Sequence, residues 1–99
     1  MNSKSELIKQ AVAKIDTDKI ASYLQHPQSK TLRRIIGYSK RVQDSDNEQE
    51  IFKLAVDLAY CLDTICDPNK AGYVKDENEK KHWLEISEEL FMNTKGKKI

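Results

Sequence analysis

Apolar side chains recur every three or four residues along almost the whole chain. This spacing places them on one face of an α-helix, whereas a half-buried strand would alternate apolar and polar residues. Alternation longer than a few residues does not occur, and there is no internal repeat. The pattern predicts helices over residues 6–15, 18–25, 30–43, 46–66 and 77–92. The second is short, and whether it packs as a separate helix stays open at this point.

Polar residues stand where these helices are expected to begin. The sequence Ser45-Asp46-Asn47-Glu48 has the form of a capping box, in which a side-chain oxygen accepts a hydrogen bond from the first turn. Pro27 should end the second helix, because the residue before a proline is disfavoured in helical geometry. Gly37 weakens the third helix by about 1 kcal/mol relative to alanine. The other candidate caps are Ser5, Asp16 or Thr17, Ser29 and Asp76.

The segment 46–66 carries the longest apolar pattern and is expected to be the central helix. Its apolar face covers about half of the circumference, and Val56 and Tyr60 would widen it. The residues of this face are Ile51, Phe52, Leu54, Ala55, Leu58, Ala59, Cys61, Leu62, Ile65 and Cys66. Elsewhere the expected core residues are Leu32, Ile35, Ile36, Ser39 and Val42 in the third helix, and Trp83, Leu84, Ile86, Leu90 and Phe91 in the fifth.

The chain has 99 residues, 38% of them hydrophobic and 33% charged, which suits one soluble domain with one core. Few glycines and prolines exclude collagen-like and low-complexity chains. The fold class predicted is therefore all-α, a compact bundle of four to five antiparallel helices. Residues 1–94 are expected to form this single domain, and residues 95–99 a basic, disordered tail.

The sequence contains no apolar run of about 18 residues, so no membrane contact is expected. Lys9 interrupts the apolar start too early for a signal peptide, which favours a cytoplasmic protein. Cys61 and Cys66 would point about 140° apart on one helix, too far for a disulfide within it. Two buried free thiols are predicted.

No catalytic residue, metal site or cofactor is predicted, and we expect the protein not to be an enzyme. His26 and His82 lie in different segments without the spacing of zinc ligands. The loop 67–78 resembles an EF-hand calcium loop in part, but Ala71 and Asn78 replace two of the required oxygen ligands.

The formal net charge is only +1, but the charges are unevenly distributed along the chain. Residues 1–42 hold nine cations and three anions (net +6), and residues 43–99 hold eight and thirteen (net −5). A helix over 30–43 would place five cations in a sector about 120° wide that contains no acid. These residues are Lys30, Arg33, Arg34, Lys40 and Arg41.

Two interpretations of this basic face stay open. It is a solvated face neutralised across a helix boundary by Asp16, Asp18 or the acids of 44–50, or it binds nucleic acid. Residues 20–35 loosely resemble a helix-turn-helix, with an alanine in the first helix, a polar turn and a basic second helix.

The acidic half offers a second candidate surface for an unidentified protein partner. Its candidate binding residues are Asp44, Asp46, Glu48, Glu50, Glu85, Glu88 and Glu89. Such a surface could cover the basic face of another protein, with electrostatically steered association. We therefore expect a non-enzymatic protein inhibitor, immunity protein or regulatory adaptor. The alternatives are a helix-turn-helix-like DNA-binding regulator that uses residues 30–41, and self-association through opposite patches.

Overall fold

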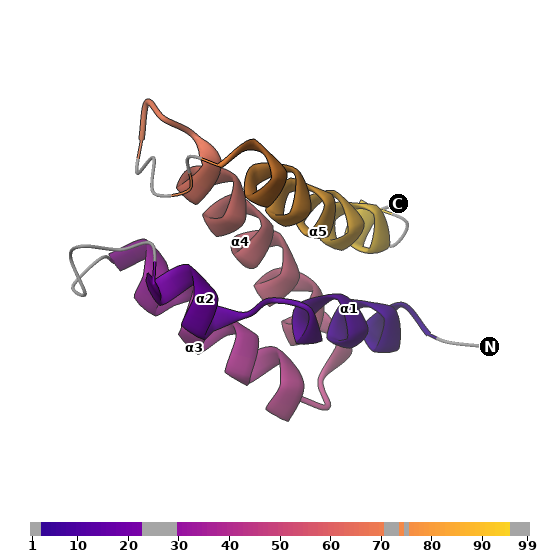
Figure 1. The fold of residues 1–99 in the computed structure, drawn as a ribbon. Helices are drawn as coiled ribbons and strands as arrows, with labels where there is room; N and C mark the ends of the chain where they lie inside the picture. The colour runs from indigo at the N-terminus through magenta and orange to yellow at the C-terminus, as the bar shows by residue number, and fades with distance from the viewer. Residues whose placement is uncertain (1–2, 23–29, 71–73, 75, 96–99) are drawn as a thin grey trace.

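The computed structural model describes residues 3–22, 30–70, 74 and 76–95. They form five helices and no strand, packed compactly as Figure 1 shows. The all-α bundle predicted from the sequence is confirmed. The helices are α1 (Lys4–Ala13), α2 (Thr17–Ser22), α3 (Lys30–Asp44), α4 (Glu48–Cys66) and α5 (Glu77–Lys95).

Helix α4 is the central element of the bundle. It contacts α1, α3 and α5, and all ten apolar residues expected on its core face are buried. Helix α1 packs against both α3 and α5, and the short α2 packs against α3 as a separate helix (Figure 1). Burial of these apolar faces, rather than helix propensity, supplies most of the stability of such helices.

Helices α4 and α5 run antiparallel along their shared interface. Near the start of α5, the Cys66 thiol lies 4.0 Å from the carbonyl oxygen of Lys80. Further along, the Ser87 hydroxyl hydrogen-bonds to the Asp63 carboxylate at 2.8 Å. The residue numbers therefore fall along α4 as they rise along α5.

Helix capping agrees with the sequence at two places. Asp16 Oδ1 accepts from the backbone N–H of Lys19 at 2.9 Å, which settles the choice between Asp16 and Thr17. Asp76 Oδ1 accepts from the N–H groups of Asn78 and Glu79 at the start of α5. The predicted cap Ser29 lies outside the described residues.

Two of the predicted caps are wrong. Helix α1 begins earlier than expected, because Ser3 and not Ser5 accepts from the N–H of Glu6, at 3.1 Å. Helix α4 begins at Glu48 instead of residue 46, because Asn47 caps it by accepting from the N–H of Glu50 at 3.0 Å. The side-chain oxygen of an asparagine can accept from the backbone N–H of the third helical residue as well as a serine hydroxyl can. The sequence alone therefore does not distinguish an asparagine cap from a serine cap.

Three side chains expected in the core are exposed. Ile36 is 44% exposed, Tyr60 60% and Leu84 43%. The helical pattern places each on the apolar side of its helix, but burial also requires a neighbouring helix that covers that part of the face. Ser39 and Phe91 are half-buried, and the remaining predicted core residues of α3 and α5 are buried.

The ends of the predicted elements follow the sequence less closely. Helix α5 extends to Lys95, the first residue of the expected tail, and residues 96–99 lie outside the described part. Helix α2 is described to Ser22, whereas the sequence predicts a helix to residue 25. Among the described residues, no helix combines the length and apolar character needed to cross a membrane.

We expect Gly37→Ala to stabilise the protein by about 0.5–1 kcal/mol. Gly37 lies in the middle of α3, and an alanine Cβ there would meet no atom within 4 Å, so only the glycine's excess unfolded-state freedom is lost. Thermal unfolding followed by circular dichroism should show a higher Tm. The exposed Gln10→Ala in α1 serves as a control, with a change within about 0.5 kcal/mol. A lower Tm for Gly37→Ala would contradict this account.

Candidate binding surfaces

The five cations of the predicted basic face are all exposed on α3. Arg41 Nη2 lies 3.9 Å from Glu50 Oε2, in a pair that is open to solvent on both sides. Such exposed ion pairs contribute little to the stability of the fold. No carboxylate in the described part of the chain lies within 4.0 Å of Lys30, Arg33, Arg34 or Lys40. Among the described residues, direct neutralisation across a helix boundary therefore reaches only Arg41 of these five cations.

The basic face extends over two edges of α3. Arg34 lines a shallow hollow against α4 with Tyr38, Asp57 and Cys61. On the opposite edge, Lys40 lines a hollow against α1 together with Ile36. The turn of the helix-turn-helix resemblance falls within residues 23–29, which lie outside the described residues.

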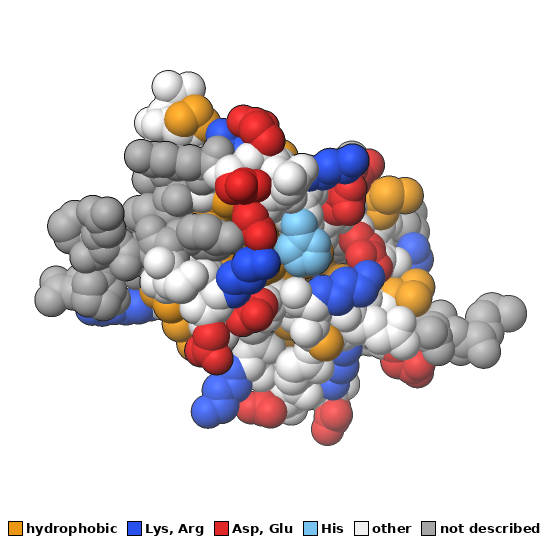
Figure 2. Space-filling view, viewed as in Figure 1, with side chains coloured by type: hydrophobic (Ala, Val, Ile, Leu, Met, Phe, Trp, Pro, Cys, Tyr) orange, Lys and Arg blue, Asp and Glu red, His pale blue; other side chains and the backbone are white. Residues whose placement is uncertain are grey.

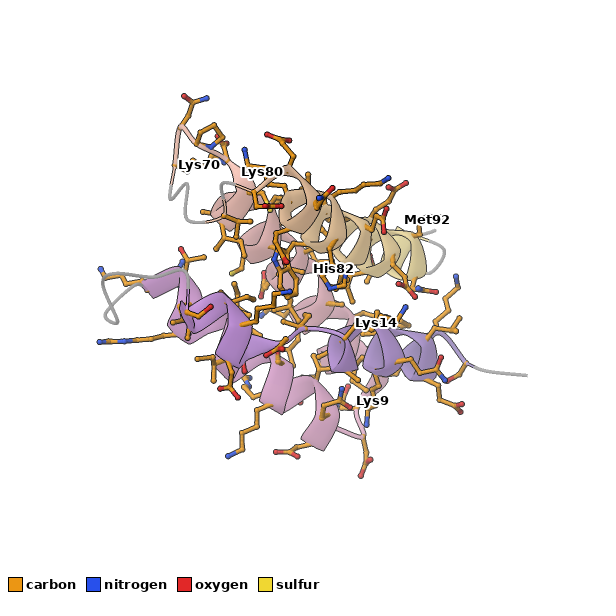
Figure 3. All side chains as sticks on the ribbon, in the orientation of Figure 1. Lys9, Lys14, Lys70, Lys80, His82 and Met92 are labelled. Carbon is orange, nitrogen blue, oxygen red and sulfur yellow. The ribbon has the colours of Figure 1, made fainter. Side chains whose placement is uncertain are left out.

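The predicted acidic residues occupy two separate places. Four of them, Asp44, Asp46, Glu48 and Glu50, lie around the connection from α3 to α4, and the other three, Glu85, Glu88 and Glu89, lie on α5. Helix α1 packs against both α3 and α5, and its Lys9 and its C-cap residue Lys14 each reach one of them. Lys9 Nζ donates to the Gln43 carbonyl of α3 at 3.3 Å, and Lys14 Nζ lies 3.3 Å from Glu89 Oε2 of α5 (Figure 3).

Ion pairs connect the basic and the acidic half of the sequence where their helices meet. Lys19 of α2 reaches Glu79 of α5 at 2.7 Å, a further ion pair between the basic and the acidic half. Figure 2 shows acidic and basic side chains interspersed on the face in view.

A groove between α4 and α5 was not predicted. Its hollow has a volume of about 370 Å³ and is open to solvent. Tyr60 borders it from α4, where its ring meets that of Phe91 edge to face with centroids 5.5 Å apart. The residues that line the hollow are Asp63, Leu84, Ser87, Glu88, Phe91 and Met92, and together with Tyr60 they define the α4/α5 groove.

The groove combines exposed apolar side chains with two carboxylates. Met92 is 64% exposed near the C-terminal end of α5 (Figure 3), and Tyr60 and Leu84 are the other exposed large apolar side chains there. Asp63 Oδ1 accepts from the buried Ser87 hydroxyl, which holds this carboxylate at the groove. Neither Asp63 nor Glu88 has a cation within 4.0 Å in the described part of the chain.

The sequence does contain a signal for this groove. Leu84, Glu88, Phe91 and Met92 follow one another at spacings of four, three and one, which places them on one stripe of α5. This stripe adjoins the core stripe that begins at Trp83, so a wheel plot merges the two into one wide apolar face. The position of α4 determines which part of this wide apolar face of α5 is covered and which part is exposed.

Both cysteines are free and buried, as predicted. Burial raises the pKa of the Cys66 thiol to about 11, and the nearby Asp63 carboxylate adds to this effect while Lys80 opposes it. Burial also raises the pKa of Cys61, opposed by Arg34 and reinforced by Asp57. Since the thiolate is the nucleophilic form, neither thiol is activated for chemistry near neutral pH.

Asp67 and His82, which the sequence analysis considered for metal binding, make contacts within the fold, whereas His26 and Ala71 lie outside the described residues. Asp67 Oδ1 accepts from the N–H of Asn69 at 2.9 Å, within the loop that resembles a calcium site in part. Asp76 caps α5, and the ring of His82 lies edge-on to that of Trp83 with centroids 4.7 Å apart. The described residues contain no group of three or more histidine, cysteine or carboxylate side chains placed to hold a metal ion.

No model of a known protein family matches the chain, and no curated protein sequence or solved structure matches it significantly.

Proposed function

We propose that this chain is a non-enzymatic binding protein that covers part of another protein as an inhibitor, immunity protein or regulatory adaptor. The observation that carries the proposal is the α4/α5 groove, where Leu84, Met92 and the bordering Tyr60 are exposed beside Asp63 and Glu88, two carboxylates without an ion-pair partner among the described residues. Two free buried thiols suit a reducing compartment, so the proposal places the protein in the cytoplasm.

Single exposed apolar side chains are normal, but a group of them at one groove is characteristic of an interaction site. Aromatic residues and methionine are enriched in protein interfaces, and methionine adapts its flexible side chain to a partner's shape. The groove supplies Tyr60, Phe91 and Met92. Carboxylates at its centre favour partners with complementary charge and speed their association.

A pair of matched variants tests this proposal. Leu84 in the groove and Ile36 on α3 are 43% and 44% exposed, so a glutamate at either position should perturb the fold equally little. Proteins captured from a host extract by the wild-type chain are quantified by mass spectrometry against each variant. We expect Leu84→Glu to deplete at least one captured protein more than tenfold, and Ile36→Glu to retain it. Equal capture by both variants, with circular dichroism showing both folded, would contradict the proposal.

The basic face of residues 30–41 supports a second candidate, a DNA-binding regulator. Lys30, Arg33, Arg34 and Lys40 are exposed and have no carboxylate within ion-pair distance in the described part of the chain. Phosphate contacts through such side chains would make the affinity fall steeply with salt. This candidate predicts binding to random duplex at about 50 mM salt that the variant Arg33→Ala/Arg34→Ala loses, while Lys81→Ala on α5 retains it. Absence of binding by the wild-type chain in a fluorescence anisotropy titration would eliminate the candidate.

A further inference from the structure

We propose that the occupant of the α4/α5 groove is an amphipathic helix of the partner that carries lysine or arginine between two apolar side chains about two turns apart. This inference rests on the proposed function and adds to it the chemistry of the partner.

The order of side chains along the groove gives the expected pattern in the partner. Leu84 lies toward one end, and Phe91 and Met92 lie toward the other with Tyr60 beside them. From residue 84 to residue 92 the helix rises by about 12 Å. Two apolar side chains seven residues apart on a docking helix are separated by about 10.5 Å along its axis, which matches this span.

The centre of the groove requires positive charge from the partner. Glu88 lies on α5 between the apolar ends, and Asp63 faces it from α4, held by its 2.8 Å hydrogen bond from Ser87. Neither has a cation within 4.0 Å in the described part, in contrast to the adjacent Glu89, which pairs with Lys14. An apolar interface closing over two unpaired carboxylates would leave them desolvated, and removal from water is costly for a charge that gains no counter-ion. A lysine or arginine on the partner removes that penalty.

The same features disfavour other occupants. Carboxylates repel nucleic acid, and an open groove would not enclose most of a small ligand, as a binding pocket does. A second copy could offer α3, where Ile36 is exposed between Arg33 and Lys40. That helix presents one exposed large apolar side chain, whereas the groove has apolar side chains at both ends.

Three synthetic 18-residue helical peptides test the inference. The first carries leucine and phenylalanine seven positions apart with two lysines between them, the second replaces the lysines with glutamate, and the third replaces the apolar pair with serine. Each is titrated into the ¹⁵N-labelled chain and followed by NMR. We expect the first peptide to saturate, with the largest shift changes on α4 and α5, and the other two to bind at least tenfold more weakly.

Variants of the chain provide the matched controls. Leu84→Glu should weaken the first peptide at least tenfold, and Glu88→Lys, which leaves Asp63 as the one carboxylate of the pair, should abolish the preference for the lysine peptide over the glutamate peptide. Ile36→Glu on α3 and Asp18→Lys on α2, which alter an exposed apolar residue and an exposed acid elsewhere, should leave binding unchanged.

Three results would overturn the inference. They are no saturable binding of the first peptide, equal affinity for the lysine and glutamate peptides, and shift changes confined to another face. A solution mass above 11.4 kDa that Ile36→Glu restores to the monomer would instead identify a second copy as the occupant. If the peptides fail while Leu84-dependent capture from the host extract persists, the partner's chemistry is wrong but the proposed function holds. Loss of both refutes the proposed function.

Discussion

Trp83→Ala is expected to lower the free energy of unfolding by about 3–5 kcal/mol. Trp83 is the largest fully buried side chain, and it lies on α5, which packs against both α4 and α1. Truncation removes apolar contacts and leaves a cavity that three packed helices can close only in part. Since domains of this size are typically stable by about 5–15 kcal/mol, the variant should be marginally folded. Urea unfolding followed by circular dichroism at 222 nm would measure the loss.

The variant Trp83→Phe separates packing from hydrogen bonding at the same position. In the described part of the chain, the buried indole Nε1–H has no hydrogen-bond partner, and a buried donor without one costs about 1–3 kcal/mol. Phenylalanine keeps an aromatic ring but is smaller, so some packing is lost. It also removes the unpaired N–H donor, and this gain should nearly cancel the lost packing, with a net loss of about 1 kcal/mol or less. If Trp83→Phe destabilises the protein as much as Trp83→Ala, the indole N–H makes a stabilising contact and this account is wrong.

The helices themselves could be predicted because their apolar periodicity is strong. All ten apolar residues that the sequence predicts on the core face of α4 are buried, since helices contact α4 on several sides. The exact start of a helix is less predictable where several polar residues compete. Ser45 and Asn47 can both cap the same helix, and the chain's path in three dimensions selects Asn47.

The α4/α5 groove could not be predicted because a helical wheel does not distinguish a face covered by another helix from a face left open. Leu84 and Trp83 are neighbours in sequence and both belong to the apolar side of α5, but Trp83 is fully buried and Leu84 is exposed. The same limit applies to Tyr60 on α4. An apolar stripe that is wider than its neighbours can cover is therefore a sign of a binding surface as well as of a core.

The positions of charged side chains were also predictable within one helix but not between helices. The basic face of α3 is local to one helix, and its cations are exposed as expected. The division of charge between residues 1–42 and residues 43–99 depends on how separate helices pack in space. For example, the packing of α1 places Lys14, at its C-terminal end, beside Glu89 of the acidic half. Sequence patterns thus predict charge within an element better than charge across the assembled surface.

Ala59→Leu is expected to destabilise the protein by about 2–4 kcal/mol and to distort the α4/α5 groove. Ala59 is fully buried in α4, and its carbonyl oxygen lies 3.2 Å from the Ser87 hydroxyl oxygen of α5, so the two helices approach closely at this turn. The larger side chain would force neighbouring helices apart, and the displacement of Ser87 would also release the Asp63 carboxylate from its hydrogen bond.

The control for Ala59→Leu is Val56→Leu, which enlarges a half-buried side chain one turn earlier in α4. It should change stability by less than about 1 kcal/mol. Thermal unfolding would then separate the variants by about 4–30 °C, given a stability difference of about 1–4 kcal/mol and a shift of about 4–8 °C per kcal/mol for a domain of this size. Because the groove depends on the spacing of α4 and α5, Ala59→Leu should weaken the lysine-containing peptide even below its own Tm. Unchanged stability with unchanged peptide binding would mean that the two helices are not held at a fixed distance, and the groove would then be no preformed surface.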